Sequence, residues 1–417
     1  MQRIRTSLPY FSEFGWDATI VTVDAKYSEI IKDDLLLKSV PAQTKVYYVK
    51  AFSKKWTQKL GLGSLALRSL WFYRKQVNHI LKHEKYDLIY FSTTQFPVCV
   101  LGSYWKKRFR IPYVIDMQDP WHSEYYQDKP LSQRPAKYWF SYRLHKYLEP
   151  VAMKQADGLI SVSDNYIDDL KARYPAIANI PSATITFGAF EPDLKIAADN
   201  QHKFKSLLQP GFINIVYVGR GGMDMHKAIV PVFQALKNGL ASQPELFEKF
   251  RFYFIGTSYA PLGKGEPTIL PLAHQYKVNK NVVEITGRIS YYHTLLTLQQ
   301  ADALLIPGSD DPKYTASKIF PYLLMQKPLL AIFNEKSNAV SVINECTANA
   351  IVLTFNEAPA ALTGALNNVF ENWANGLFTP VKVLKCFEQY SAKNLTSKQA
   401  ELFNNAIKHY EAKNTNA

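Results

Sequence analysis

The feature that most restricts the fold is a series of short, continuous apolar segments that recur between helical stretches along the whole chain. Parallel strands that helices cover on both faces have this composition, because neither face of such a strand meets water. We therefore predict parallel sheets. The segments are residues 17–23, 86–92, 112–117, 157–163, 183–187, 212–219, 251–256, 281–287, 302–307, 328–333 and 350–355.

The series of strands is interrupted between residues 191 and 210. This stretch is polar and poor in helix signals, so we interpret it as a linker. A chain of 417 residues is also too long for one ordinary core. The prediction is an α/β protein with two doubly wound, Rossmann-like domains, 1–190 and 211–381, that face each other across a cleft.

The composition limits the class of protein. The three cysteines, Cys99, Cys346 and Cys386, are too few and too widely spaced to indicate a disulfide framework or a zinc site. No run of 18 apolar residues is present, and no signal peptide is recognisable. We expect a cytoplasmic protein, with its thiols in the core.

The net charge of +14 is unevenly distributed, since residues 1–190 carry +10 of it. Segments 52–76 and 104–110 combine Lys and Arg with Trp, Phe and Leu, a composition that suits an anionic membrane surface. The alternative is a solvated helix face with its apolar side in the core. Binding to nucleic acid is not expected, because no recognised motif is present and the basic residues do not follow one element.

A candidate anion site follows the strand at 212–219. Arg220 and Lys227 flank the glycine-rich turn Gly219-Arg220-Gly221-Gly222, which lets backbone N–H groups approach a ligand closely. Ser317 and Lys318 stand where another helix is predicted to begin. Such a set of cations, amides and a hydroxyl can hold a diphosphate without a metal. The alternatives are a plain strand-to-helix turn with a solvated arginine and a solvent-facing lysine.

Other polar residues also follow predicted strands, where ligands bind in doubly wound sheets. In the second half these residues are Gly256, Thr257, Arg288, Asp310 and Asp311, which the family resemblance given below assigns to the nucleotide. In the first domain, the segment Asp119-Pro120-Trp121-His122 follows the strand at 112–117. A cleft between the domains would collect these loops.

Several long segments together resemble GT-B glycosyltransferases of the family 4 type. They are VGRGGMDMHKAIVPVFQAL, VVEITGRISYYHTLLTLQQADALLIP and TASKIFPYLLMQKPLLAI in the second half, and PYVIDMQDPW and LEPVAMKQADGLISVS in the first. The resemblance implies sugar transfer from a nucleotide-diphosphate donor, UDP- or GDP-linked, without a metal or other cofactor and with retention of anomeric configuration. It also implies that a C-terminal helix at 382–413 returns to the first domain.

The resemblance implies roles for individual residues. Arg220 and Lys227 would neutralise the departing diphosphate, with Ser317 and Lys318 on the same phosphates. Asp119 and His122 would face the donor sugar or the acceptor hydroxyl, although an Asp-Pro turn that caps backbone amides is an equal alternative. Trp121, Tyr125 and Tyr126 would line the acceptor site, but aromatic residues as frequent as these are often core residues.

The sequence departs from the family pattern in two places. Positions 313 and 321, where the family has glutamates, hold Lys313 and Pro321, so Asp310 or Asp311 would have to bind the ribose, or the activity would be weakened. The chain also opens with a predicted helix that ends at Gly15, where similar enzymes have a strand and a glycine-rich loop first. We therefore expect translation to begin upstream of Met1.

The leading hypothesis is a transferase of cell-envelope polysaccharide or glycolipid synthesis, peripheral on the inner face of the membrane. A nucleotide-sugar epimerase is an alternative because it has the same fold. A non-catalytic homologue that binds a sugar or a partner is a third hypothesis, which the loss of the ribose glutamate favours and the retained Arg220, Lys227 and Lys318 oppose.

Overall fold

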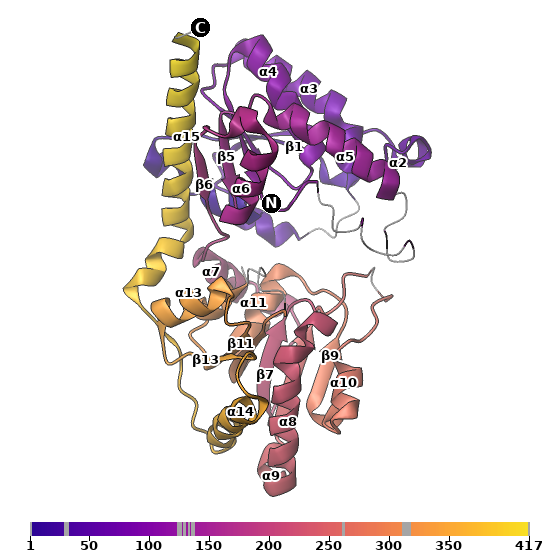
Figure 1. Cartoon of the computed structure of the whole chain (residues 1–417), viewed down its shortest axis with the longest axis vertical. Helices are drawn as coiled ribbons and strands as arrows, with labels where there is room; N and C mark the ends of the chain where they lie inside the picture. The colour runs from indigo at the N-terminus through magenta and orange to yellow at the C-terminus, as the bar shows by residue number, and fades with distance from the viewer. Residues whose placement is uncertain are drawn as a thin grey trace. The chain divides into compact units, whose positions relative to one another are not determined.

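The computed structural model divides the chain into two compact units, 1–187 with 392–417, and 188–391. It describes residues 2–28, 33–122, 127, 131, 134, 138–260, 263–310 and 318–415. All eleven predicted strands are present. The fold is α/β, with parallel sheets in both units, as Figure 1 shows.

In unit 1 the strands form two separate parallel sheets. Among the described strands, β1 (Thr19–Val23) pairs only with β2 (Lys45–Val49). β3 (Ile89–Ser92), β4 (Tyr113–Met117), β5 (Gly158–Ser161) and β6 (Ser182–Thr184) form a four-stranded sheet in that order. β4 and β5 are buried at every position, whereas β1 is half-buried throughout. The prediction that a strand precedes Met1 stays a prediction.

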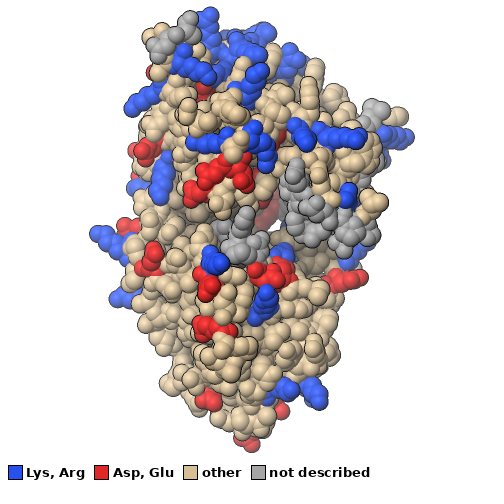
Figure 2. All heavy atoms as spheres, viewed as in Figure 1, with Lys and Arg blue, Asp and Glu red and all other residues tan. Residues whose placement is uncertain are grey.

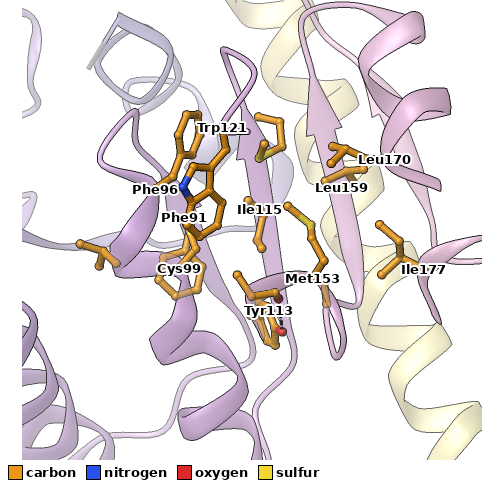
Figure 3. Close-up of a cluster of buried hydrophobic side chains, with 14 of the residues drawn as sticks. Phe91, Phe96, Cys99, Tyr113, Ile115, Trp121, Met153, Leu159, Leu170 and Ile177 are labelled. Atoms are coloured by element: carbon orange, nitrogen blue, oxygen red, sulfur yellow. Dashed lines mark hydrogen bonds between the residues drawn. The ribbon is translucent and has the colours of Figure 1, made fainter. Parts of the chain in front are cut away.

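A large apolar core lies on one face of the four-stranded sheet (Figure 3). Phe91, Tyr113, Ile115 and Leu159 project from the strands into this core. Facing helices supply the other side of it, because each carries apolar residues at helical spacing. The helices of unit 1 that precede β6 are α1 (Gln2–Ser7), α2 (Lys54–Thr57), α3 (Leu65–His83), α4 (Val100–Phe109), α5 (Tyr138–Met153) and α6 (Asp164–Arg173).

The C-terminal helix α15 (Ala392–Thr415) belongs to unit 1, although it follows unit 2 in the chain. Its Leu395, Leu402 and Phe403 share a core with Val114 and Ile160 on the sheet. Gly158 lets the helix approach closely, since a Cβ there would lie 3.2 Å from the Cβ of Ala406. A segment more than 200 positions away in sequence thus covers the second face of this sheet.

Unit 2 has one six-stranded parallel sheet in the order β13-β11-β10-β7-β8-β9. The strands are β7 (Ile213–Val218), β8 (Phe250–Ile255), β9 (Val282–Ile285), β10 (Ala303–Pro307), β11 (Leu329–Phe333) and β13 (Ile351–Thr354). The helices are α7 (Pro192–Asp199), α8 (His226–Ser242), α9 (Pro244–Phe247), α10 (Leu270–Gln275), α11 (Tyr291–Gln300), α12 (Ile319–Leu324), α13 (Asn338–Cys346) and α14 (Pro359–Ala374).

The structure corrects the interpretation of residues 191–210 as a helix-poor linker. Pro192 begins α7, and Asp193 of this helix is buried and accepts a 2.9 Å hydrogen bond from Tyr292 of α11. The segment is therefore part of unit 2. Three strands were not predicted: β2 and the short pair β12 (Thr347–Ala348) and β14 (Lys382–Val383). None of the described helices is both long and apolar enough to cross a membrane.

Candidate functional site

The candidate site of unit 2 lies where β7 and β10 diverge. β8 and β9 follow β7 on one side of it, and β10 and β11 lie on the other, so the direction of strand addition reverses between β7 and β10. Loops that leave the carboxyl ends of strands at such a point separate and form a binding crevice. The loop after β7 contains Gly219 and Arg220, and the loop after β10 contains Ser309 and Asp310.

Tyr322 of α12 occupies this point and was not predicted. Its hydroxyl accepts a 2.8 Å hydrogen bond from the N–H of Val218 and donates a 3.2 Å bond to the carbonyl of the same residue. The hydroxyl therefore replaces a neighbouring strand at the end of β7. Lys318 lies one helical turn before Tyr322, which directs it toward the same end of the strand.

Lys318 lies directly against the glycine-rich turn. A Cβ added at Gly219 would be 2.7 Å from the Lys318 ammonium and 2.5 Å from the Tyr217 hydroxyl, so only glycine fits there. The ammonium is also 6.0 Å from the centre of the Tyr217 ring. The absence of a side chain at Gly219 thus leaves room for the lysine beside the backbone of the turn.

Arg220 is held by a carboxylate that the sequence interpretation missed. Its guanidinium donates two hydrogen bonds to Asp224, at 2.9 and 2.5 Å, and Ser309 donates a 2.8 Å bond to the same carboxylate. Burial alone would raise the pKa of Asp224, but the hydrogen bonds from Arg220 and Ser309 outweigh it and hold the pKa below its ordinary value. Asp224 is therefore ionised at neutral pH and links the two loops.

Three cations gather at this site. Burial, together with the positive charges of Arg220 and Arg288, lowers the pKa of Lys318 to about 8. Lys318 is still largely protonated at pH 7, so within the described part of the site the Asp224 carboxylate offsets one of these three positive charges. Arg288 is exposed, with its guanidinium 4.0 Å from the centre of the Tyr259 ring. The cluster has an excess of positive charge that an anionic ligand can neutralise.

The remaining predicted residues of unit 2 have varied positions. Lys227 is exposed on the first turn of α8. Thr257 is buried and its hydroxyl donates a 2.7 Å bond to Glu284. Gly256 has a φ of +75°, which favours glycine, and Gly221 lies close to Thr257 and Thr268. The side chain of Asp310 is exposed while its N–H bonds the carbonyl of Asp224.

Unit 1 contains a separate pocket of about 570 Å³ at the carboxyl end of β4. Asp119 and His122 both line it. The Asp119 side chain reaches solvent, but the surrounding protein partly desolvates its carboxyl group and so raises its pKa. His122 is buried. The pKa of His145 is lowered, first because this residue is desolvated and second because the charge of His122 is close to it. The pocket is further lined by Met117, Pro120, Trp121, Lys146, Glu149, Tyr166, Asp169, Leu170 and Arg173.

Trp121 is both a pocket residue and a core residue. Its ring is 6% exposed and stacks on Phe96 at 5.6 Å with an interplanar angle of 22°. Figure 3 shows it beside Phe91 and Phe96, at the upper end of the core. The predicted residues Tyr125, Tyr126, Asp311 and Ser317, and also Lys313, lie outside the described part of the chain.

Comparison with known proteins gives one family match. Residues 41–185 match the family model of Glycosyltransferase Family 4, which covers most of unit 1 before α15. A search among curated proteins found no significant match to the sequence.

Solved structures resemble the chain over nearly its full length. The N-terminal domain of trehalose-6-phosphate phosphatase from Candida albicans has a TM-score of 0.56 at 12% identity, with 96% of this chain and 93% of that chain covered. An α,α-trehalose-phosphate synthase (UDP-forming) from Burkholderia vietnamiensis has a TM-score of 0.47 at 10% identity, with 96% and 99% covered. The chain thus resembles GT-B glycosyltransferases, with two Rossmann-like units and a match to the family 4 model over residues 41–185.

Proposed function

We propose that the protein is a glycosyltransferase that moves a sugar from a UDP- or GDP-linked donor to a polysaccharide or lipid-linked acceptor. The observation that carries the proposal is the cation cluster of Lys318, Arg220 and Arg288 in unit 2, with Lys318 against Gly219. The fold and the family match over residues 41–185 support the same class of reaction.

The cluster suits a diphosphate leaving group. Negative charge grows on the nucleotide as the glycosidic bond breaks, so cations fixed beside the phosphates favour the transition state. Arg220 is already oriented by Asp224, and Lys318 becomes more basic when a phosphate offsets the neighbouring arginines. We propose that these side chains supply the charge that a metal ion supplies in other transferases, which makes the reaction metal-independent.

The pocket of unit 1 is the proposed acceptor side. Its volume of about 570 Å³ is in the range for one or two sugar rings. Asp119 is the residue we assign to a sugar or acceptor hydroxyl, because its raised pKa makes it a better proton acceptor than an ordinary aspartate. His122 lies in the same wall of the pocket. Retention of the anomeric configuration is part of the proposal.

Calorimetry with nucleotides tests the donor site. UDP or GDP should bind more tightly than the corresponding monophosphate, because the second phosphate adds charge-assisted hydrogen bonds. Lys318→Gln should weaken diphosphate binding by about 10- to 100-fold, the equivalent of about 1.5–3 kcal/mol for one charged hydrogen bond. The affinity of the unchanged protein should also fall as the pH rises through about 8, the pKa of Lys318.

The matched control is Lys237→Gln, an exposed lysine further along α8, which should leave nucleotide binding unchanged. Equal Kd values for Lys318→Gln, Lys237→Gln and the unchanged protein would remove the basis of the donor site.

Turnover assays separate the alternatives. Transfer that continues in EDTA, with the product anomer identified by NMR, is the expected result. Conversion of the nucleotide sugar without an acceptor would instead indicate an epimerase. Nucleotide binding with no turnover over a broad donor and acceptor screen would indicate a non-catalytic homologue, the hypothesis that Pro321 in place of a glutamate favours.

A further inference from the structure

Three of the seven tryptophans are strongly exposed, and all three lie in unit 1. Trp56 is 74% exposed, Trp71 is 53% exposed and Trp139 is 64% exposed. A single exposed apolar side chain is normal, but a group of exposed aromatic residues marks a contact surface. Each of the three has a cation near its ring, at 5.4–5.7 Å from the centroid: Lys59 with Trp56, Lys75 with Trp71, and Arg143 with Trp139.

The exposed aromatic residues form neighbouring groups. Phe52 is 49% exposed, and its ring lies 6.4 Å from that of Trp71. The turn that follows α2 ends at Gly61, where an added Cβ would be 3.0 Å from the ring of Phe140, the neighbour of Trp139 in α5. The segment with Trp56 therefore connects Phe52 to the start of α5. Leu62, just after this turn, is 40% exposed. We call Phe52, Trp56, Leu62, Trp71 and Trp139 the Trp surface.

The charge of the sequence segments that carry the Trp surface has one sign. Residues 35–83 contain ten Lys and Arg and no Asp or Glu, and residues 131–148 contain no acidic residue either. Figure 2 shows Lys and Arg side chains gathered over the part of unit 1 that carries α2, α3, α4 and α5. The excess of positive charge in these segments attracts an anionic partner to this region.

The second basic segment, 104–110, differs from the first. Trp105 is 2% exposed and donates a 3.0 Å hydrogen bond to Asn78, and Lys106 forms a 2.5 Å ion pair with Asp157. Trp105 is thus a core residue, which agrees with the alternative interpretation of this segment as a solvated helix face with its apolar side in the core. The apolar part of the contact surface is provided by the first segment and by α5.

We propose that the Trp surface docks unit 1 on an anionic lipid bilayer. Indole rings lie at the level of the lipid headgroups, where the ring contacts the acyl chains and the N–H stays hydrated, while lysines beside it attract anionic headgroups. A nucleic acid would need open aromatic faces for base stacking, whereas these three rings each have a cation of this chain beside them. The inference does not depend on the proposed transferase function.

Vesicle co-sedimentation tests the proposal with the full chain. Binding should be strong to vesicles of phosphatidylcholine mixed with phosphatidylglycerol, weak to phosphatidylcholine alone, and reduced by salt. Each lysine near the surface contributes about a fivefold change in affinity, so Lys55→Glu with Lys59→Glu should weaken binding by at least about 25-fold. Trp56→Ala should weaken binding by about tenfold, as expected for loss of a buried aromatic side chain.

Matched controls come from unit 2. The double variant Lys382→Glu, Lys385→Glu reverses the charge of two exposed side chains. The variant Leu377→Ala removes an apolar side chain that is 63% exposed. Both controls should bind vesicles as the unchanged protein does. Thermal unfolding, measured on every variant, should stay unchanged and shows that each has folded.

Three results would overturn the proposal. One is equal binding of the Trp56 and Lys55/Lys59 variants and the controls to anionic vesicles. Another is no vesicle binding by the unchanged protein. The third is tighter binding to single-stranded RNA or DNA than to the vesicles, with loss in the same variants, which would assign the surface to nucleic acid. A failure of nucleotide binding would count against the transferase proposal and leave the vesicle results unaffected.

Discussion

The lowered pKa of Lys318 leads to a prediction about stability. Its pKa falls from 10.5 to about 8 in the folded protein because of burial and the charges of Arg220 and Arg288. At 1.36 kcal/mol per pKa unit, the charged lysine costs the folded state about 3 kcal/mol. We expect Lys318→Met, which removes the charge but keeps a similar volume, to stabilise unit 2 by up to about 3 kcal/mol at pH 7.

The pH dependence gives the sign of the effect. Between pH 8 and 10.5 the unfolded chain binds a proton at Lys318 that the folded protein has lost, so the free energy of unfolding of the unchanged protein rises with pH. Below pH 8 the full penalty is present. The advantage of Lys318→Met should therefore be largest at pH 7 and smaller at pH 10.

Urea unfolding from pH 7 to 10 measures this difference, with hydrogen exchange of peptides from β7 and β10 to isolate the transition of unit 2. The contributions of other titrating groups to the free energy of unfolding cancel when the variant is compared with the unchanged protein at each pH. Lys227→Met, which removes an exposed lysine, should change stability by less than about 0.5 kcal/mol. A Lys318→Met difference that is absent at pH 7, or constant from pH 7 to 10, would refute the account of Lys318 as a half-buried cation whose charge destabilises the folded state.

Further predictions concern the two cores. Gly239→Ala should destabilise unit 2 by about 1–3 kcal/mol, because the added Cβ would lie 1.9 Å from the Phe247 ring. Gly364→Ala should instead stabilise unit 2 by about 0.5–1 kcal/mol, because no atom lies within 4 Å of the added Cβ. Thermal unfolding of the two variants measures both effects. Asp116→Asn should cost unit 1 about 3–5 kcal/mol in urea unfolding, since it leaves the buried Arg3, now 2.7 Å from Asp116, without its counter-charge. A loss below about 1 kcal/mol would contradict this.

The strands of both units could be predicted because buried parallel strands have a continuous apolar composition. β10 and β11 are buried at every position and match predicted segments closely. β2, in contrast, was missed because four of its five positions are exposed or half-buried and its sequence KVYYV mixes lysine with tyrosine. α7 was missed because its polar face dominates the sequence, whereas its attachment to α11 depends on a distant tyrosine, Tyr292.

The candidate site was predicted in part. Arg220 and Lys318 could be found because glycines and cations after a strand have a direct chemical meaning. The roles of Asp224 and Tyr322 could not, since both depend on β7 and β10 being neighbours that diverge, and the order of strands in a sheet is not encoded in any single segment. Lys227 has the same chemistry as Lys318, but its position on the helix leaves it exposed.

The division of the sheet in unit 1 has a consequence for how this unit opens. Among the described strands, β1 and β3 belong to different sheets, so the segment 16–50 is joined to the rest by side chains, including the 3.1 Å bond from Tyr86 to Thr19. Such a segment can detach without breaking a backbone ladder of the four-stranded sheet. Proteases should cut it first, and its amides should exchange well before those of β4 and β5.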